Sequence, residues 1–173
     1  KEWFKIDSLQ YISNLKNKIN LYFDIFENFH ISDKTFPLYG KSIVRNEKYI
    51  GSKKLVIDAY ENYEHIFVQS KNQNVEKKDI EELTNFLKST IDNLINPNEE
   101  HMSTIITGIY ITDKLFTPEA LNFGRKFKFS KNFAFGLKGW CHIQTVLVEL
   151  GTNQIYTNKS SKNLKPICQA ILK

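Results

Sequence analysis

The chain has 173 residues, of which 41% are hydrophobic and 13% aromatic, and its formal net charge is +5. A chain of this size buries roughly two-thirds of the surface that its unfolded form exposes, so we expect one domain over residues 1–173. The apolar content excludes a disordered chain. Apolar runs are far shorter than the roughly 20 residues of a membrane span, and the N-terminus has no apolar signal-peptide stretch. We therefore expect a cytoplasmic protein with no membrane partner.

The basic pI near 9.0 permits binding to nucleic acid, because cations near phosphates release counterions. Among the 24 basic residues only Arg45 and Arg125 are arginines, and lysine lacks the planar fork that reads bases. A genome biased toward Lys, Asn and Ile would give the same composition. Cys141 and Cys168 lie in apolar patterns, which indicates reduced core thiols.

The first part of the chain is expected to form one helix and a set of antiparallel strands. Apolar residues recur every three or four positions over residues 9–23, which predicts an amphipathic helix with Asp7 or Ser8 as its N-cap. The helical period is lost over residues 24–69, where we expect three or four antiparallel strands. The breaks between them are predicted at Asp33-Lys34, Pro37, Asn46-Glu47 and Gly51-Ser52. The last two strands, 55–60 and 65–70, would form a hairpin with a turn at 61–64.

In the second part of the chain, helices and strands alternate. The pattern over residues 80–95 predicts a second amphipathic helix, and the β-branched run 105–112 predicts a central strand. Thr117 as N-cap followed by Pro118 predicts the start of a third helix. Strands are expected at 133–137, 141–150 and 154–157, and a short helix at 164–172. The predicted fold is a single α/β domain, in the order αβββ(β)αβαβββα, with a mixed sheet of about six to eight strands flanked by helices.

One group of side chains in the predicted hairpin suggests chemistry. A turn at 61–64 would place Asp58 opposite Phe67, so that Asp58, Gln69 and Lys71 project from the same face. A carboxylate, an amide oxygen and an ammonium group at one place could hold a divalent cation and orient a water molecule against a phosphodiester.

The order of these segments resembles the Mrr-type branch of the restriction-endonuclease-like fold, the PD-(D/E)XK superfamily. The resemblance spans residues 55–123 and rests on Asp58, on the segment Val68-Gln69-Ser70-Lys71, and on a helix and a strand followed by Phe116-Thr117-Pro118-Glu119. It implies that Asp58 ligates Mg²⁺, that Gln69 assists as a second ligand and that Lys71 polarises the water or stabilises the pentavalent phosphate. Asp58 departs from the family pattern because no glycine flanks it.

Two basic clusters are candidate DNA contacts. The first comprises Lys41, Arg45, Lys53 and Lys54, and the second comprises Lys128 and Lys131, which alternate with phenylalanines that could stack on bases. Solvated strands with exposed lysines and core phenylalanines would give the same patterns. We therefore expect a nucleic-acid-interacting domain, either a metal-dependent nuclease or a degenerate relative of one. The alternative is a non-enzymatic adaptor that binds another protein or a second copy of itself.

Overall fold

The computed structural model of the chain describes residues 5–49 and 56–173. Its helices are α1 (Ser8–Ile19), α2 (Lys77–Leu94), α3 (Pro118–Lys126) and α4 (Lys165–Ile171), with 3₁₀ turns η1 (Ala134–Gly136) and η2 (Lys159–Leu164). The strands are β1 (Asp24–Ile31), β2 (Lys34–Tyr49), β3 (Val56–Lys71), β4 (His101–Thr112), β5 (Ser130–Asn132), β6 (Trp140–Glu149) and β7 (Gln154–Thr157).

These strands form one mixed sheet, as the sequence predicted. Seven described strands take the order β1-β2-β3-β4-β6-β5, and β7 pairs with the far end of β6. The first three strands are antiparallel to one another, whereas β3, β4 and β6 run parallel. The parallel pairs arise because α2 and α3 carry the chain back between successive strands.

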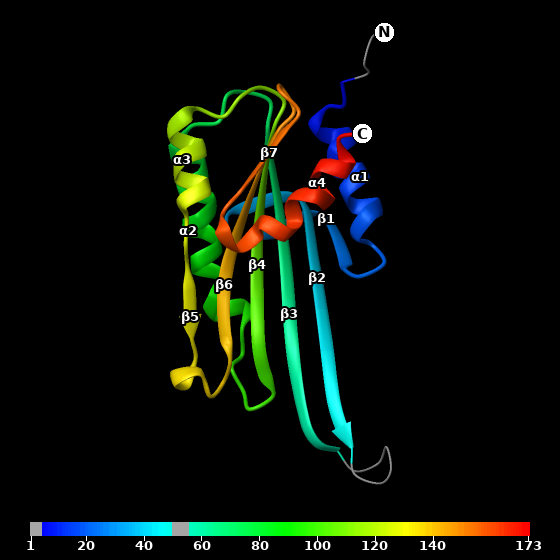
Figure 1. Ribbon diagram of the computed structural model, residues 1–173, viewed down its shortest axis with the longest axis vertical. Helices are drawn as coiled ribbons and strands as arrows, with labels where there is room; N and C mark the ends of the chain where they lie inside the picture. Colours follow the sequence, from blue (N-terminus) through cyan, green and yellow to red (C-terminus); the bar gives the residue numbers. More distant parts are fainter. Residues whose placement is uncertain (1–4, 50–55) are drawn as a thin grey trace.

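Helices cover both faces of the sheet (Figure 1). Residues of α2 and α3 pack on one face around Phe67, Ile106 and Leu147, and this cluster holds most of the buried aromatic rings. On the other face, α1 and α4 pack around Val68 and Ile109. In Figure 1, α1 and α4 cross only the upper part of the sheet, while β2 and β3 extend well below them.

The helix starts follow the predicted capping signals. Asp7 caps α1 by accepting a hydrogen bond from the backbone of Gln10, and Thr117 caps α3 in the same way at Ala120. Helix α2 and the central position of β4 are also as predicted. Cys141 and Cys168 are buried free thiols, and burial raises the pKa of both.

The predicted hairpin over residues 55–70 is wrong, because β3 runs without a turn from Val56 to Lys71. Its partner is β2, and the predicted turn residues are paired on both sides, for example Glu64 with Ser42 and with Ile105. The polar run 61–64 looked like a turn because this part of the sheet has no helix over it. Within this run, Glu61 has a structural role, because its carboxylate forms an ion pair with Arg45 of β2 at 2.9 Å.

Three further predicted boundaries also differ. Pro37 lies inside β2, opposite Asn28 of β1. Asn28 has a positive φ of 48°, which interrupts the pairing register at this point, so the proline costs no ladder hydrogen bond with β1. Asn46-Glu47 also lies inside β2, while Gly51-Ser52 falls outside the described residues. The predicted strand 133–137 is the 3₁₀ turn η1, because Ala134, Phe135 and Gly136 all have positive φ.

Candidate nucleic-acid interface

The three residues of the predicted catalytic group lie on one strand and do not meet. Asp58 is near the start of β3 and pairs with Lys48, whereas Lys71 is the last residue of β3. Thirteen strand positions span roughly 40 Å, and an odd separation directs the two side chains to opposite faces of the sheet. The convergence of Asp58 with Gln69 and Lys71 is therefore not found, because it depended on a turn that does not form.

Gln69 and Lys71 have local roles at the end of β3. The Lys71 ammonium group forms an ion pair with Asp79 of α2 at 3.0 Å, and the Gln69 side chain accepts a hydrogen bond from the backbone of Ser70. A Mg²⁺ ion needs several oxygen ligands around one point. Asp58 and Gln69 cannot supply them together, so the donor set does not fit the ion. Within the described residues, no three His, Cys, Asp or Glu side chains cluster as metal ligands.

The first predicted basic cluster is not a free positive surface. Arg45 forms ion pairs with Glu47, Glu61 and Glu100, so three carboxylates oppose its charge. Lys41 lies on β2 opposite His65, four positions before Arg45 along the strand. Lys53 and Lys54 lie outside the described residues. In the second cluster, Lys131 is paired with Asp92 at 3.4 Å, while Lys128 is exposed.

A different group of lysines lies on η2 and the start of α4. Lys159, Lys162 and Lys165 are all exposed and are spaced by three residues. A 3₁₀ helix has three residues per turn, so side chains at this spacing stack in one row, with about 6 Å between successive members. The inner row of the same turn contains the buried residues Asn158 and Ser161. We call Lys128, Lys159, Lys162 and Lys165 the lysine cluster.

Two members of the lysine cluster, Lys128 and Lys159, line a shallow pocket of about 370 Å³. Lys128 and Phe129 form one side of the pocket, while Lys159 and Ser160 of η2 form another. His142 of β6 also lines it and stacks against Trp140, with ring centroids 5.0 Å apart and an angle of 14° between the planes. Trp140 leaves 37% of its surface exposed. The site thus combines cations with an accessible aromatic stack.

His142 is held as a neutral ring. Its half-buried position lowers the pKa of its imidazole, because removal from water disfavours the charged form. Gln144 lies beside it, with 3.3 Å between the Gln144 Nε2 and His142 Nε2 atoms, and the same amide nitrogen donates to the carbonyl oxygen of Ser160 at 2.6 Å. At neutral pH the positive charge at this site therefore comes from the lysines, and His142 contributes an aromatic surface.

Asn158 fixes the position of the lysine row. Its side chain is 1% exposed, and its Nδ2 donates to the carbonyl oxygen of Phe127 at 3.0 Å. Its Oδ1 accepts from the backbone of Thr145 at 3.3 Å and from the Ser161 hydroxyl at 2.7 Å. One amide thus joins the end of α3, strand β6 and η2. This junction sets Lys159 relative to Lys128 on the two sides of the pocket.

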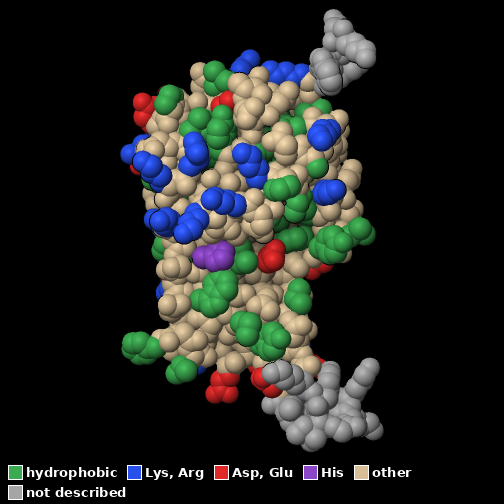
Figure 2. Space-filling model, in the orientation of Figure 1, with side chains coloured by type: hydrophobic (Ala, Val, Ile, Leu, Met, Phe, Trp, Pro, Cys, Tyr) green, Lys and Arg blue, Asp and Glu red, His purple; other side chains and the backbone are tan. Residues whose placement is uncertain are grey.

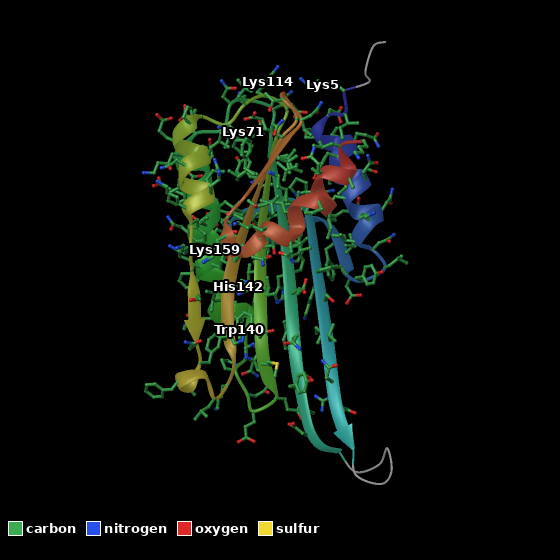
Figure 3. All side chains as sticks on the ribbon, viewed as in Figure 1. Lys5, Lys71, Lys114, Trp140, His142 and Lys159 are labelled. Atoms are coloured by element: carbon green, nitrogen blue, oxygen red, sulfur yellow. The ribbon has the colours of Figure 1, made fainter. Side chains whose placement is uncertain are left out.

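The members of the lysine cluster are not neutralised by neighbouring carboxylates, which is also true of other described lysines such as Lys34 and Lys114. Among the described residues, none of the four cluster members has a carboxylate within ion-pair distance, whereas Lys16, Lys77 and Lys78 are all paired. Figure 2 shows basic side chains gathered over the upper part of one face, with a few acidic ones at its upper left edge, near its centre and at its lower end. Figure 3 places Lys159, His142 and Trp140 one below another on that face.

The sequence analysis identified Lys128 but missed the other three lysines and the aromatic stack. The available signal was the spacing Lys159-x-x-Lys162-x-x-Lys165, but the terminal helix predicted over 164–172 contains Lys165 and excludes the other two lysines. A spacing of three becomes a row only if the segment is a 3₁₀ helix. His142 lies on the predicted strand 141–150 but Trp140 precedes it, so the prediction did not indicate that the two rings share a face.

No helix in the described part of the chain has the length and apolarity needed to cross a lipid bilayer. A family model described as a domain of unknown function, DUF8052, matches residues 7–170. Searches of curated proteins and of solved structures gave no match. Because the family model spans nearly the whole described chain, this protein belongs to the DUF8052 family.

Proposed function

We propose that this protein is a nucleic-acid-binding module that recognises single-stranded segments. The lysine cluster would contact successive phosphates, and Trp140 would stack on an exposed base. The observation that carries the proposal is the row of three unpaired lysines beside the pocket lined by Lys128 and His142. Single strands suit this surface because their unstacked bases are free to lie on aromatic rings, which a duplex prevents.

We also infer a restriction-endonuclease-like arrangement for the sheet. Its support is the order β2, β3, α2, β4 and α3, with β3 and β4 parallel, which agrees with the order of segments behind the resemblance. The hairpin of that order is formed by β2 and β3, not by two halves of β3. Since Asp58 lies far from Lys71, the degenerate, non-cleaving form of such a domain is the proposal that we carry forward.

A salt titration tests the phosphate contacts. Replacing Lys159, Lys162 and Lys165 by glutamine should weaken binding of a fluorescent single-stranded oligonucleotide by at least about tenfold. The slope of log K against log salt should fall by about two, since each phosphate contact on a single strand contributes roughly 0.7. Fluorescence anisotropy between 50 and 300 mM salt, about the range in which such contacts weaken, gives both quantities.

The matched control replaces Lys16, Lys77 and Lys78, which removes the same formal charge from lysines that are already paired. An equal loss in both triple variants would contradict the proposal, because it would reflect net charge alone. The same samples, incubated with Mg²⁺ or with EDTA beside Asp58→Ala, test for cleavage. If no salt-dependent binding occurs, we assign the chain to the protein-binding class, whose support is the exposed pair Phe135 and Leu137 on the turn η1.

A second variant tests the stacking contact. Trp140→Leu should lower affinity for single-stranded DNA by roughly tenfold, because a stacked base contributes about 1–3 kcal/mol. The salt slope should not change, since no phosphate contact is lost. Phe135→Leu is the control, because Phe135 is fully exposed on η1, whereas Trp140 stacks against His142 of the pocket. Equal effects of the two substitutions would contradict a role for Trp140.

A further inference from the structure

A second and larger cavity lies on the same face of the sheet, where the helix layer ends. It is a groove of about 740 Å³, within the range of roughly 300–1,000 Å³ that is usual for small-molecule sites. One wall is formed by Leu15 and Ile19 of α1, and another by Ile167 and Cys168 of α4. In Figure 1 the strands below these helices have no helix in front of them on this face.

The pairing register defines the floor of the groove. Ser42, Glu64 and Ile105 are cross-strand neighbours on β2, β3 and β4. Ile66 follows Glu64 two positions later, so it projects from the same face in the next row. The floor is thus largely aliphatic, with one carboxylate near its centre.

Glu64 is exposed at the mouth of the groove and has no hydrogen-bond or ion-pair partner among the described residues. Other acidic side chains near the sheet are engaged, such as Glu61 with Arg45 and the buried Glu149 with the backbone of Phe116. The surrounding groove raises the pKa of the Glu64 carboxyl group, because it removes part of the water that stabilises the charge. A cation placed here would gain a charge-assisted hydrogen bond and restore what the carboxylate has lost.

We propose that this groove binds an aliphatic ligand that carries one ammonium group. The hydrocarbon chain would lie along Ile66, Ile105 and Ile109, and the ammonium group would donate to the Glu64 carboxylate. This groove adjoins the nucleic-acid interface at Gln144 but has a different lining, so either proposal can fail without the other.

An anionic ligand bound at Lys18 would fit this groove less well than a cationic ligand bound at Glu64. Lys18 is the only basic residue that lines the groove among the described residues, and it lies exposed on the rim at α1. A lysine on a flexible stem keeps its ammonium group in water. Glu64 is also exposed, but its backbone lies on a paired strand between Ser42 and Ile105, in the middle of the floor.

Calorimetric titration with three ligands of equal chain length tests the proposal. Decylamine, decanol and decanoate present a cationic, a neutral and an anionic group on the same hydrocarbon. Decylamine should bind with one-to-one stoichiometry, and Glu64→Gln should weaken it by at least about tenfold, as expected for a lost charged hydrogen bond. Glu82→Gln is the charge-matched control, because Glu82 is exposed on α2, over the other face.

A second variant covers the case in which Glu64→Gln disturbs folding. Ser42→Trp should fill the groove beside Glu64 and abolish decylamine binding while leaving the unfolding midpoint nearly unchanged, since aromatic residues suit a half-exposed strand. Equal binding of the three ligands, binding insensitive to Glu64→Gln, or no binding would each overturn the proposal. Sedimentation showing a dimer that Ser42→Trp dissociates would also overturn it, because the apolar rim at Leu21 and Tyr22 would then be a self-interface.

Discussion

Asn158→Leu should lower the free energy of unfolding by about 3 kcal/mol. The Asn158 side chain is buried and hydrogen-bonds to Phe127, Thr145 and Ser161. Leucine has nearly the same size but offers no hydrogen bond, so a carbonyl, an amide and a hydroxyl group would lose a partner inside the protein. Each buried group left unpaired costs about 1–3 kcal/mol, and local rearrangement recovers part of that sum.

Chemical denaturation with urea gives this free energy directly. In a chain of this length, 3 kcal/mol corresponds to a fall of about 10 °C in Tm. Asn163→Leu is the matched control, because Asn163 is an exposed asparagine in the same segment, and surface changes usually stay within about 0.5 kcal/mol. A loss of less than about 1 kcal/mol at Asn158 would show that the three elements are held together by other contacts.

The same substitution connects stability with the proposed function. Asn158 precedes Lys159 directly and holds the end of α3, after which Lys128 follows. If the junction loosens, the two sides of the pocket should move independently, and single-stranded DNA should bind more weakly even though no cation is lost. The salt slope should then stay close to the wild-type value, unlike in the triple lysine variant.

The elements that could be predicted from the sequence are those set by local signals. The caps Asp7 and Thr117 and the apolar period of α2 depend on neighbouring residues, and these predictions are confirmed. The hairpin at 61–64 failed because a polar run can equally be an uncovered stretch of a long strand. The two possibilities differ in whether a helix covers that stretch. The helices on this face, α1 and α4, come from the two ends of the chain, so local sequence does not reveal their position.

The candidate interface shows the same division. Lys128 could be identified from its alternation with phenylalanines, a pattern within a few residues. The lysine row needed the 3₁₀ geometry of η2, which is fixed by the contact of Asn158 with Phe127, about thirty positions away. Predicting whether Asp58 lies beside Lys71 required the correct pairing partner of β3. The predicted turn would bring the two residues together, whereas in the continuous strand they lie near its opposite ends.

The second large effect is expected in the pH dependence of stability, and its origin is His65. This side chain is 1% exposed, its Nδ1 lies 2.7 Å from the Tyr39 hydroxyl, and its Nε2 has no partner among the described residues. Burial, with a smaller contribution from Lys41, lowers the pKa of His65 to about 4. The ring is therefore neutral in the folded protein at pH values where the unfolded chain, with a pKa near 6.5, is protonated.

The direction of the effect follows from proton uptake. Between about pH 6.5 and pH 4 the unfolded state binds more protons at this site, so the free energy of unfolding falls as the pH is lowered. A shift of this size corresponds to about 3 kcal/mol, present in full above pH 6.5 and lost by about pH 4. His65→Asn removes the titration and keeps a group able to bond the Tyr39 hydroxyl. Urea unfolding at half-unit steps from about pH 4 to 7.5 should show the wild type losing about 3 kcal/mol relative to this variant.

His30→Asn is the control, since it removes an exposed imidazole from β1. Other groups, such as His142 with its lowered pKa and Glu64 with its raised pKa, are present in all three proteins, so their contributions cancel in the difference. Parallel curves for the wild type and His65→Asn would mean that water or a local opening reaches Nε2 and lets the ring gain its proton without unfolding. A difference that grows only as the pH falls would identify His65 as the buried base whose protonation the folded sheet cannot accommodate.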